Sequence, residues 1–222
     1  MFVLAGCQAL PPAGSTAGSA VQSAAQPALP ADLPRFVVDE QASEIRLLVY
    51  RAGPLARFGH NHVISGRVRG EIRAGARVAE SAFRLEIPAE SFVVDAVPAR
   101  AEEGEAFAAA VSEQAREATR ANLLGKDVLD AARAPLIEVE SVAIAGPRWG
   151  PTVQARIKLR DATRTLQFPA AVFEQGDALT VVAAFQVRQS EFGLVPFSAL
   201  GGAIQVRDAI EVRLRLVARR AR

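Results

Sequence analysis

The chain has 222 residues, of which 50% are hydrophobic and 23% charged, and its formal net charge is +2. This length and composition suit one globular domain with an ample core, with or without a tail. The basic residues are scattered and only 6% of all residues are aromatic, so binding to nucleic acid is not expected. The single cysteine, Cys7, excludes an internal disulfide and a metal cluster built from cysteines. No apolar run has the length of about 18 residues that would predict a membrane-spanning helix.

The first residues resemble a secretion and lipidation signal. Residues 4–7, Leu-Ala-Gly-Cys, are similar to the lipobox of bacterial lipoproteins, in which the cysteine carries the lipid. The apolar stretch before Cys7 is short and has no basic residue ahead of it, so we interpret it as a truncated signal. The alternative is a cysteine with no such role. Gln8, in place of aspartate, favours the outer membrane. We therefore expect lipidation at Cys7 and a periplasmic lipoprotein that associates with the outer membrane through its anchor alone.

The segment after the cysteine has the composition of a tether. It is rich in Ala, Pro, Ser, Gly and Gln, with almost no charge and no periodic apolar pattern. Such a composition cannot bury a core and is expected to stay disordered. We therefore divide the chain into residues 1–33, the truncated signal and Ala/Pro/Ser tether, and residues 34–222, the folded domain.

Alternating hydrophobicity predicts strands along most of the folded domain. Residues 210–216 alternate strictly between apolar and charged side chains, which is typical of a strand with one buried and one solvated face. In the second predicted strand Gly66 and Gly70 share one face, where we expect a sharp bend or the close approach of another backbone. Comparable patterns predict strands at residues 43–53, 62–72, 77–87, 153–160, 166–173, 179–188 and 210–216.

One segment interrupts this pattern. Residues 99–124 are rich in Ala, Glu and Arg, and their apolar residues recur near helical spacing, which predicts a helix over residues 103–122. About eight antiparallel strands close most economically into a barrel, because closure removes the exposed edges. The fold class that we predict is therefore all-β dominated: an antiparallel barrel of about eight strands with one inserted α-helix. A barrel of this size can hold an apolar ligand.

Five stretches in the same order resemble the YceI-like family, a lipocalin-like barrel of secreted bacterial proteins. The resemblance covers roughly residues 34–219. No single motif is very specific, but the ordered set is. The stretches are FVVDEQASEIRLLVYRAG, FGHNHVISGRVRGEI, NLLGKDVLDAARAPLIEVES, VQARIKLRDATRTLQFPAAV and SEFGLVPFSALGGAIQVRDAIEVRLRL. The resemblance implies an apolar barrel that holds a long polyisoprenoid chain, such as an isoprenoid quinone or related lipid, and it implies no catalytic activity.

The stretch FGHNH holds both histidines of the chain, and several interpretations remain open. If a strand starts at Gly59, His60 and His62 point to one face and two imidazoles could hold a transition metal. The domain then has to supply further ligands from Asp or Glu, so we assign no metal site. No Ser or Cys nucleophile is arranged with them, which leaves no catalytic residue to assign. The other interpretations are a strand-entry turn capped by Asn61, and a hydrogen bond to the polar end of a ligand at the barrel mouth.

The phenylalanines either line a ligand tunnel or simply fill the core, and the strand pattern allows both. They are Phe83, Phe92, Phe107, Phe168, Phe185, Phe192 and Phe197. We expect Phe92, Phe107 and Val111 to close one mouth as a lid, and Phe192, Leu194 and Phe197 to form a second mouth. The complete set of candidate ligand-binding residues is Phe58, His60, Asn61, His62, Phe92, Phe107, Val111, Phe192, Leu194 and Phe197.

The function that the sequence favours is non-catalytic binding or carriage of a polyisoprenoid, or another long apolar lipid, in the bacterial periplasm. No cofactor is implied beyond a bound isoprenoid quinone or lipid, and a homodimer is compatible with the sequence. Two alternatives stay open. One is a metal-dependent enzyme or redox accessory that uses His60 and His62. The other is a structural or partner-binding lipoprotein with a filled barrel.

Overall fold

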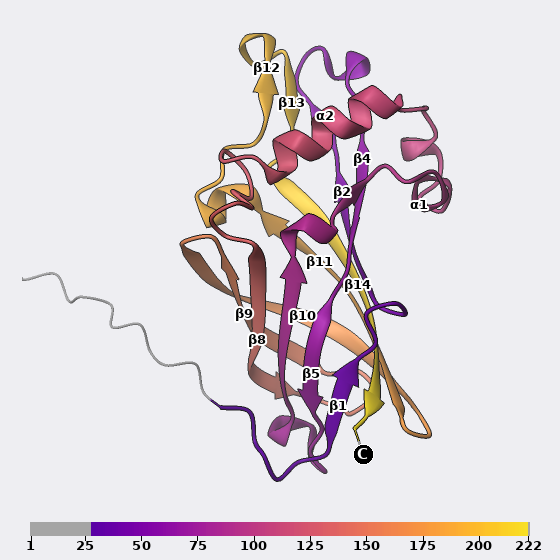
Figure 1. Ribbon diagram of the computed structural model, residues 1–222, viewed down its shortest axis with the longest axis vertical. Coiled ribbons are helices and arrows are strands. Elements are labelled where there is room, and N and C mark those ends of the chain that lie inside the picture. The colour runs from indigo at the N-terminus through magenta and orange to yellow at the C-terminus, as the bar shows by residue number, and fades with distance from the viewer. Residues whose placement is uncertain (1–27, 222) are drawn as a thin grey trace, which may run out of the picture.

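A closed antiparallel barrel forms the body of the protein in the computed structural model, which describes residues 28–221 (Figure 1). Its eight strands follow one another around the ring as β1 (Arg35–Val38), β5 (Arg69–Arg73), β6 (Ala82–Pro88), β8 (Leu136–Ala145), β9 (Thr152–Leu159), β10 (Ala162–Gln175), β11 (Ala178–Arg188) and β14 (Ala209–Arg220), which pairs back onto β1. The predicted β-barrel is therefore confirmed. The predicted lipidation site Cys7 and most of the predicted tether lie outside the described residues.

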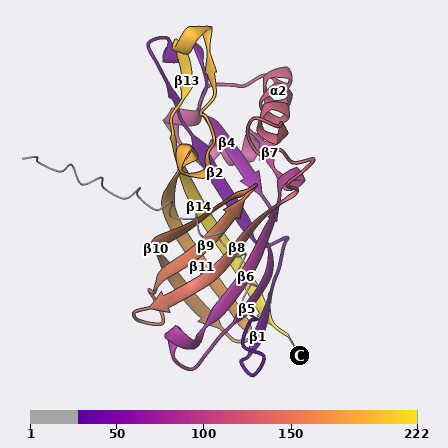
Figure 2. The ribbon, with the colours of Figure 1, turned by 90° about the vertical axis from the view of Figure 1, so that its left-hand side faces the viewer.

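The long strand β14 carries two partners on the same side. Its C-terminal end pairs with β1, and its middle pairs with a further strand that lengthens the wall at one end of the barrel. This extension consists of β2 (Glu44–Val49), β4 (His62–Gly66) and β7 (Val93–Val94). A small sheet projects beyond the same end (Figures 1 and 2) and consists of β3 (Arg51–Ala52), β12 (Ser198–Ala199) and β13 (Ile204–Val206).

The residue pattern of β14 explains how the wall separates inside from outside. Ile210, Val212 and Leu216 are buried, whereas Arg213 between them is exposed. Side chains alternate across a strand, so strict apolar–charged alternation places one row in the barrel and the other in solvent. The predicted alternation is confirmed along this strand, and the apolar rows of its neighbours meet it inside the ring.

The single strand predicted over residues 62–72 is wrong, because the chain bends and forms two strands with different neighbours. β4 pairs with β2 and β7, whereas β5 pairs with β1 and β6. The two glycines explain the bend. Gly70 has a φ of 139°, and a Cβ there would lie 2.1 Å from the carbonyl oxygen of Arg84 on β6. A Cβ at Gly66 would lie 2.6 Å from the ring of Phe92. The expected close approach of another backbone is confirmed at Gly70, whereas the close neighbour of Gly66 is a side-chain ring.

The helix predicted over residues 103–122 is also wrong in its first half. Gly104 has a φ of 74°, and the chain turns there instead of continuing as a helix. Phe107 is buried against Leu48 and Tyr50, so burial of one aromatic ring outweighs the helical propensity of the Ala-rich sequence around it. The observed helix starts later, after Ser112, whose hydroxyl accepts a hydrogen bond from the Ala115 amide at 3.2 Å. The helices are α1 (Val97–Ala101) and α2 (Glu113–Leu124).

Short 3₁₀ turns join several strands, and one of these turns shortens a predicted strand. The strand predicted over residues 77–87 begins only at Ala82, because a turn closed by Arg77 and Glu80 precedes it. Within residues 28–221 no helix has both the length and the apolar character needed to cross a membrane. The turns are η1 (Ala56–Phe58), η2 (Val78–Glu80), η3 (Ala89–Ser91), η4 (Glu105–Phe107), η5 (Gln189–Phe192) and η6 (Leu200–Gly202).

Candidate ligand-binding cavity

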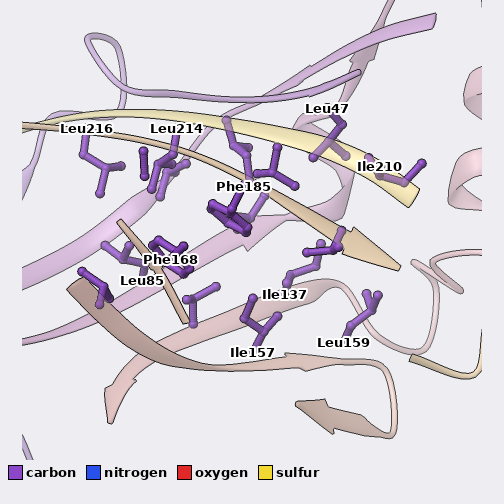
Figure 3. A pocket seen from close by; sticks show the side chains of 18 of the residues that line it. Leu47, Leu85, Ile137, Ile157, Leu159, Phe168, Phe185, Ile210, Leu214 and Leu216 are labelled. Atoms are coloured by element: carbon purple, nitrogen blue, oxygen red, sulfur yellow. The ribbon is translucent and has the colours of Figure 1, made fainter. Parts of the chain in front are cut away.

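The barrel interior holds an elongated apolar cavity of about 460 Å³. Its wall comes from every strand of the ring except β1, with further residues from β2 and β4, and the side chains converge on the empty space (Figure 3). The residues labelled there are Leu47, Leu85, Ile137, Ile157, Leu159, Phe168, Phe185, Ile210, Leu214 and Leu216. Aliphatic and aromatic side chains fill only part of the interior, which leaves room for an apolar guest.

Two aromatic rings stack in the wall of the cavity. The ring centroids of Phe168 on β10 and Phe185 on β11 lie 4.1 Å apart, and the ring planes differ by 10°. Both residues line the cavity. Phe92, which also lines it, is only 1% exposed and packs against Gly66. These rings give the cavity a rigid apolar surface, because aromatic side chains have few rotatable bonds.

One end of the cavity is bordered by polar side chains from three turns and strands. Ser81, Arg148 and Glu174 line it there. Arg148 forms an ion pair with Glu174, and its guanidinium also donates to the carbonyl oxygen of Gly75 at 2.8 Å. The ion pair therefore connects the turn between β8 and β9 to β10, and the hydrogen bond connects the same turn to the loop after β5.

The opposite end lies near α2 and the segment that follows β11. From α2, Ala118, Thr119, Asn122 and Leu123 reach the cavity, and the helix itself packs beside β7. From the other side come Phe192, Leu194, Phe197 and Val206. Phe197 is 50% exposed, so its ring both lines the cavity and faces solvent. This end therefore combines an apolar border with the few polar groups of α2.

The structure brings five of the ten predicted ligand-binding residues to the cavity. They are His62, Phe92, Phe192, Leu194 and Phe197. The other five do not line it: Phe58, His60, Asn61, Phe107 and Val111. The expectation that Phe107 and Val111 act as a lid therefore has no counterpart in this arrangement. Phe107 instead belongs to a separate buried cluster behind β2 and β4, and Phe58 is 63% exposed.

Asn61 has the capping role that the turn interpretation assigns to it. Its side-chain oxygen accepts from the Arg51 amide at 3.0 Å, and its side-chain nitrogen donates to the carbonyl oxygen of Ala106 at 2.8 Å. The rings of His60 and His62 lie 6.4 Å apart, centroid to centroid. Within residues 28–221 no group of three or more His, Cys, Asp or Glu side chains is placed to hold a metal ion.

A buried carboxylate that the sequence analysis missed holds His62. Asp95 is fully buried, and its Oδ2 lies 2.6 Å from Nδ1 of His62. Its other oxygen, Oδ1, accepts from the Val63 amide at 2.9 Å and from the guanidinium of Arg100 at 2.5 Å. The Asp95 amide in turn donates to the carbonyl oxygen of Val63 at 2.7 Å. Asp95 is therefore fastened to β4 from both its backbone and its side chain.

Arg100 completes this buried polar group and was also missed. Besides Asp95, its guanidinium donates to the carbonyl oxygens of Asn61, Phe107 and Ala109 at 2.6–2.8 Å. A planar guanidinium carries five N–H donors, which suits it to gather several carbonyls at once. Arg100 thus fixes the FGHNH turn, α1 and the following loop relative to one another.

The electrostatics of the group keep Asp95 ionised. Burial by itself would raise the pKa of Asp95, but hydrogen bonds from His62, from the Val63 amide and from Arg100 outweigh it and hold that pKa below its ordinary value. The only local sequence signal was an acidic residue directly after the apolar pair Val93-Val94. Asp95 and His62 are 33 residues apart, so no spacing motif joins them.

The comparison with protein families finds one match. The model of the YceI-like domain matches residues 36–218. This confirms the predicted family resemblance over nearly the whole described region. No curated protein matches the chain at a significant level.

Solved structures of the same architecture share little sequence with the chain. BcnA of Burkholderia cenocepacia is 16% identical with a TM-score of 0.54, and the match covers 81% of this chain and 98% of BcnA. A polyisoprenoid-binding domain from Saccharophagus degradans, implicated in plant cell wall breakdown, is 11% identical with a TM-score of 0.54, covering 85% and 99%. The YceI protein of Campylobacter jejuni is 10% identical with a TM-score of 0.50, covering 70% and 82%. At these identities the likeness concerns the fold.

Proposed function

Because the chain belongs to the YceI-like domain family, we propose that it is a non-catalytic carrier or buffer for one long apolar ligand, a polyisoprenoid or similar lipid. The observation that carries the proposal is the elongated cavity of about 460 Å³, whose wall is almost wholly aliphatic and aromatic. A filled, purely structural barrel would lack such a space. The name of the Saccharophagus degradans neighbour, a polyisoprenoid-binding domain, supports the same ligand class.

The mechanism of binding is removal of the chain from water. Each CH₂ buried in an apolar site contributes about 0.8 kcal/mol, so a ten-carbon stretch contributes roughly 8 kcal/mol before the entropic cost of association. The cavity wall supplies no polar partner over most of its length, which suits a hydrocarbon chain and disfavours a polar one. Polar groups border the cavity only at its two ends, where they can orient a single polar terminus of the ligand.

The proposed location is the periplasm, with anchoring to the outer membrane through Cys7. The support is the lipobox-like sequence at residues 4–7 and the low-complexity spacer that follows it. A carrier anchored in this way stays near the membrane surface from which an insoluble lipid has to be collected. Mass spectrometry of the protein recovered from bacterial membranes tests this by the mass of a lipid on the N-terminal peptide.

The test of ligand binding is native mass spectrometry of the purified protein combined with organic extraction. Ile157→Trp places a large ring inside the cavity, and Thr165→Trp places the same ring on the exposed side of β10. We expect one equivalent of extractable isoprenoid or lipid in the parent protein and in Thr165→Trp, and a strong loss in Ile157→Trp. Lipid-free parent protein, or equal lipid content in both variants, would refute the proposal.

A second pair of variants repeats the test by removing a ring. Phe168 lines the cavity, whereas Phe173 on the same strand is 59% exposed and faces away from it. Phe168→Ser is expected to reduce bound lipid, and Phe173→Ser to leave it unchanged. Circular dichroism of each variant establishes that the barrel is intact before lipid content is compared.

A further inference from the structure

The side of His62 that remains available to the cavity has a defined hydrogen-bonding character. Asp95 is an ionised, fully buried carboxylate and can only accept hydrogen bonds. Its Oδ2 lies 2.6 Å from Nδ1 of His62, so Nδ1 carries the proton. In a neutral imidazole the other nitrogen, Nε2, is then unprotonated and offers a lone pair.

That lone pair has no partner among the described residues. Nδ1 of His62 bonds to Asp95, and no protein donor bonds to Nε2 in residues 28–221. The imidazole lines the cavity, and its side chain is 16% exposed. His62 is therefore a polar group that borders an otherwise apolar space with an unused acceptor.

A second group near the same end of the cavity has the same character. Thr119 lines the cavity from α2, and its hydroxyl donates its one proton to the carbonyl oxygen of Ala115 at 2.8 Å. Its oxygen keeps lone pairs that can accept a hydrogen bond. α2 packs beside β7, which pairs with β4, the strand that begins at His62. Three side chains with N–H donors also line this end. Arg188 is exposed and faces Asp208 at 3.8 Å, the side-chain amide of Gln189 donates to the carbonyl oxygen of Arg207 at 2.9 Å, and Asn122 is exposed.

We propose that His62, positioned by Asp95, selects the polar end of the ligand, so that the cavity prefers a long isoprenoid ending in a hydroxyl group, an alcohol or a phenol, over one ending in a carbonyl or ether. This inference rests on the proposed function and deepens it. A hydroxyl donates to Nε2, whereas a carbonyl or ether oxygen would set its lone pairs against the lone pair of Nε2. An acceptor that the ligand covers without pairing it costs enough that we expect roughly tenfold discrimination.

The binding test uses two ligands that differ only in the donor: a twenty-carbon isoprenoid alcohol and its methyl ether. Their dissociation constants are measured at pH 8. The parent protein is expected to bind the alcohol roughly tenfold more tightly. His62→Leu removes the acceptor, so the two ligands are expected to bind that variant about equally.

The ligand preference of Asp95→Asn tests the positioning role of Asp95, because a purely structural role would not reverse that preference. The Val63 amide and Arg100 both donate to Oδ1, so the amide oxygen of Asn has to stay at that position. The amide NH₂ then faces Nδ1 of His62 and turns that nitrogen into an acceptor. The imidazole proton moves to Nε2, which becomes a donor, and the preference is expected to reverse toward the ether.

The tautomer of His62 is also measured directly, without any ligand. The chain has two histidines, so ¹⁵N-histidine labelling gives two sets of ring signals, and His60→Gln assigns them. We expect the Nδ1–H tautomer for His62 in the parent protein at pH 8. This measurement tests the position of the imidazole proton even where Asp95→Asn fails to fold.

The possible results distinguish a failure of this inference from a failure of the proposed function on which it rests. Equal affinity of the parent protein for alcohol and ether, or an Nε2–H tautomer of His62, overturns the selection while lipid binding stands. A tenfold preference that is lost in His62→Leu supports both. Absence of binding for either ligand in every form of the protein overturns the proposed function, and this inference with it.

Discussion

Asp95 and His62 form a hydrogen-bonded pair, Oδ2 to Nδ1 at 2.6 Å, between the loop that follows β7 and the first residue of β4. The pair lies where the barrel wall is extended, and through His62 it connects the buried Asp95–Arg100 ion pair to the wall of the cavity. Asp95 also has a φ of 53°, a left-handed conformation that aspartate and asparagine tolerate better than most residues.

Loss of the Asp95 carboxylate is expected to destabilise the protein strongly. Asp95→Ala leaves the buried guanidinium of Arg100 without its charged partner and the Val63 amide without its acceptor, and breaking a buried ion pair in this way costs about 3–5 kcal/mol. Urea unfolding measures the change in the free energy of unfolding. Glu86→Ala is the control, because its pair with Arg69 is exposed and is worth about 1 kcal/mol or less. Equal unfolding midpoints for the two variants would contradict the structural role of Asp95.

The same carboxylate gives the stability a defined dependence on pH. The pKa of Asp95 is lower in the folded protein than its ordinary value of about 3.9, so the folded state binds the proton less readily than the unfolded chain. Its contribution is fully present above about pH 5 and is lost as the pH falls through the folded value. Hydrogen bonding from Arg35 also lowers the pKa of Glu71, which adds to the loss of stability in acid.

The contribution of Asp95 to the pH dependence of stability is therefore obtained by comparing the parent protein with a variant. Unfolding free energies from pH 5.5 down to pH 2.5 are compared between the parent protein and Asp95→Asn, which cannot titrate. We expect the parent protein to lose stability more steeply than the variant over this range. Parallel curves would show that Asp95 has the same pKa in both states.

The bend between β4 and β5 depends on the absence of a side chain at Gly66. A Cβ there would lie 2.6 Å from the ring of Phe92, which is too close, so Gly66→Ala is expected to cost about 1–3 kcal/mol through overpacking. The smaller side chain in Gly66→Ala/Phe92→Leu makes room and is expected to restore part of this loss. Thermal unfolding measures both. Gly150→Ala, where the nearest atom is 4.0 Å away, serves as the neutral control.

The parts of the fold that sequence predicted are those where neighbouring residues carry the signal. The alternation of residues 210–216 reports directly on which side chains face the barrel, and Gly66 and Gly70 correctly marked a close approach. The long helix failed because composition favoured it locally, while burial of Phe107 in a distant cluster decided the conformation. Helical propensity is a weak predictor where burial of one large ring in the core favours another backbone conformation.

The candidate site was predictable only in part for a similar reason. His62 was singled out because histidine is rare in this chain, and several phenylalanines were singled out because they are large and apolar. Asp95 has only a weak local signal, its place after an apolar pair, and Arg100 has none, since their partners are brought together by the pairing of β4 with β7 and by the turn at α1. Which ring faces the cavity and which lies behind the wall is decided by that topology.

Binding of the apolar ligand is expected to raise the melting temperature of the protein. A ligand that binds only the folded state at a hundred times its dissociation constant adds about 2.7 kcal/mol of stability. For a domain of this size that corresponds to a rise of about 5–10 °C. Lipid-free protein, obtained by unfolding, extraction and refolding, is heated with and without the twenty-carbon isoprenoid alcohol. Ile157→Trp, whose added ring occupies the cavity, should show little or no rise, whereas Thr165→Trp should respond like the parent protein. An equal rise in all three would place the ligand on the outside of the barrel, because only an interior site is blocked by a ring at position 157.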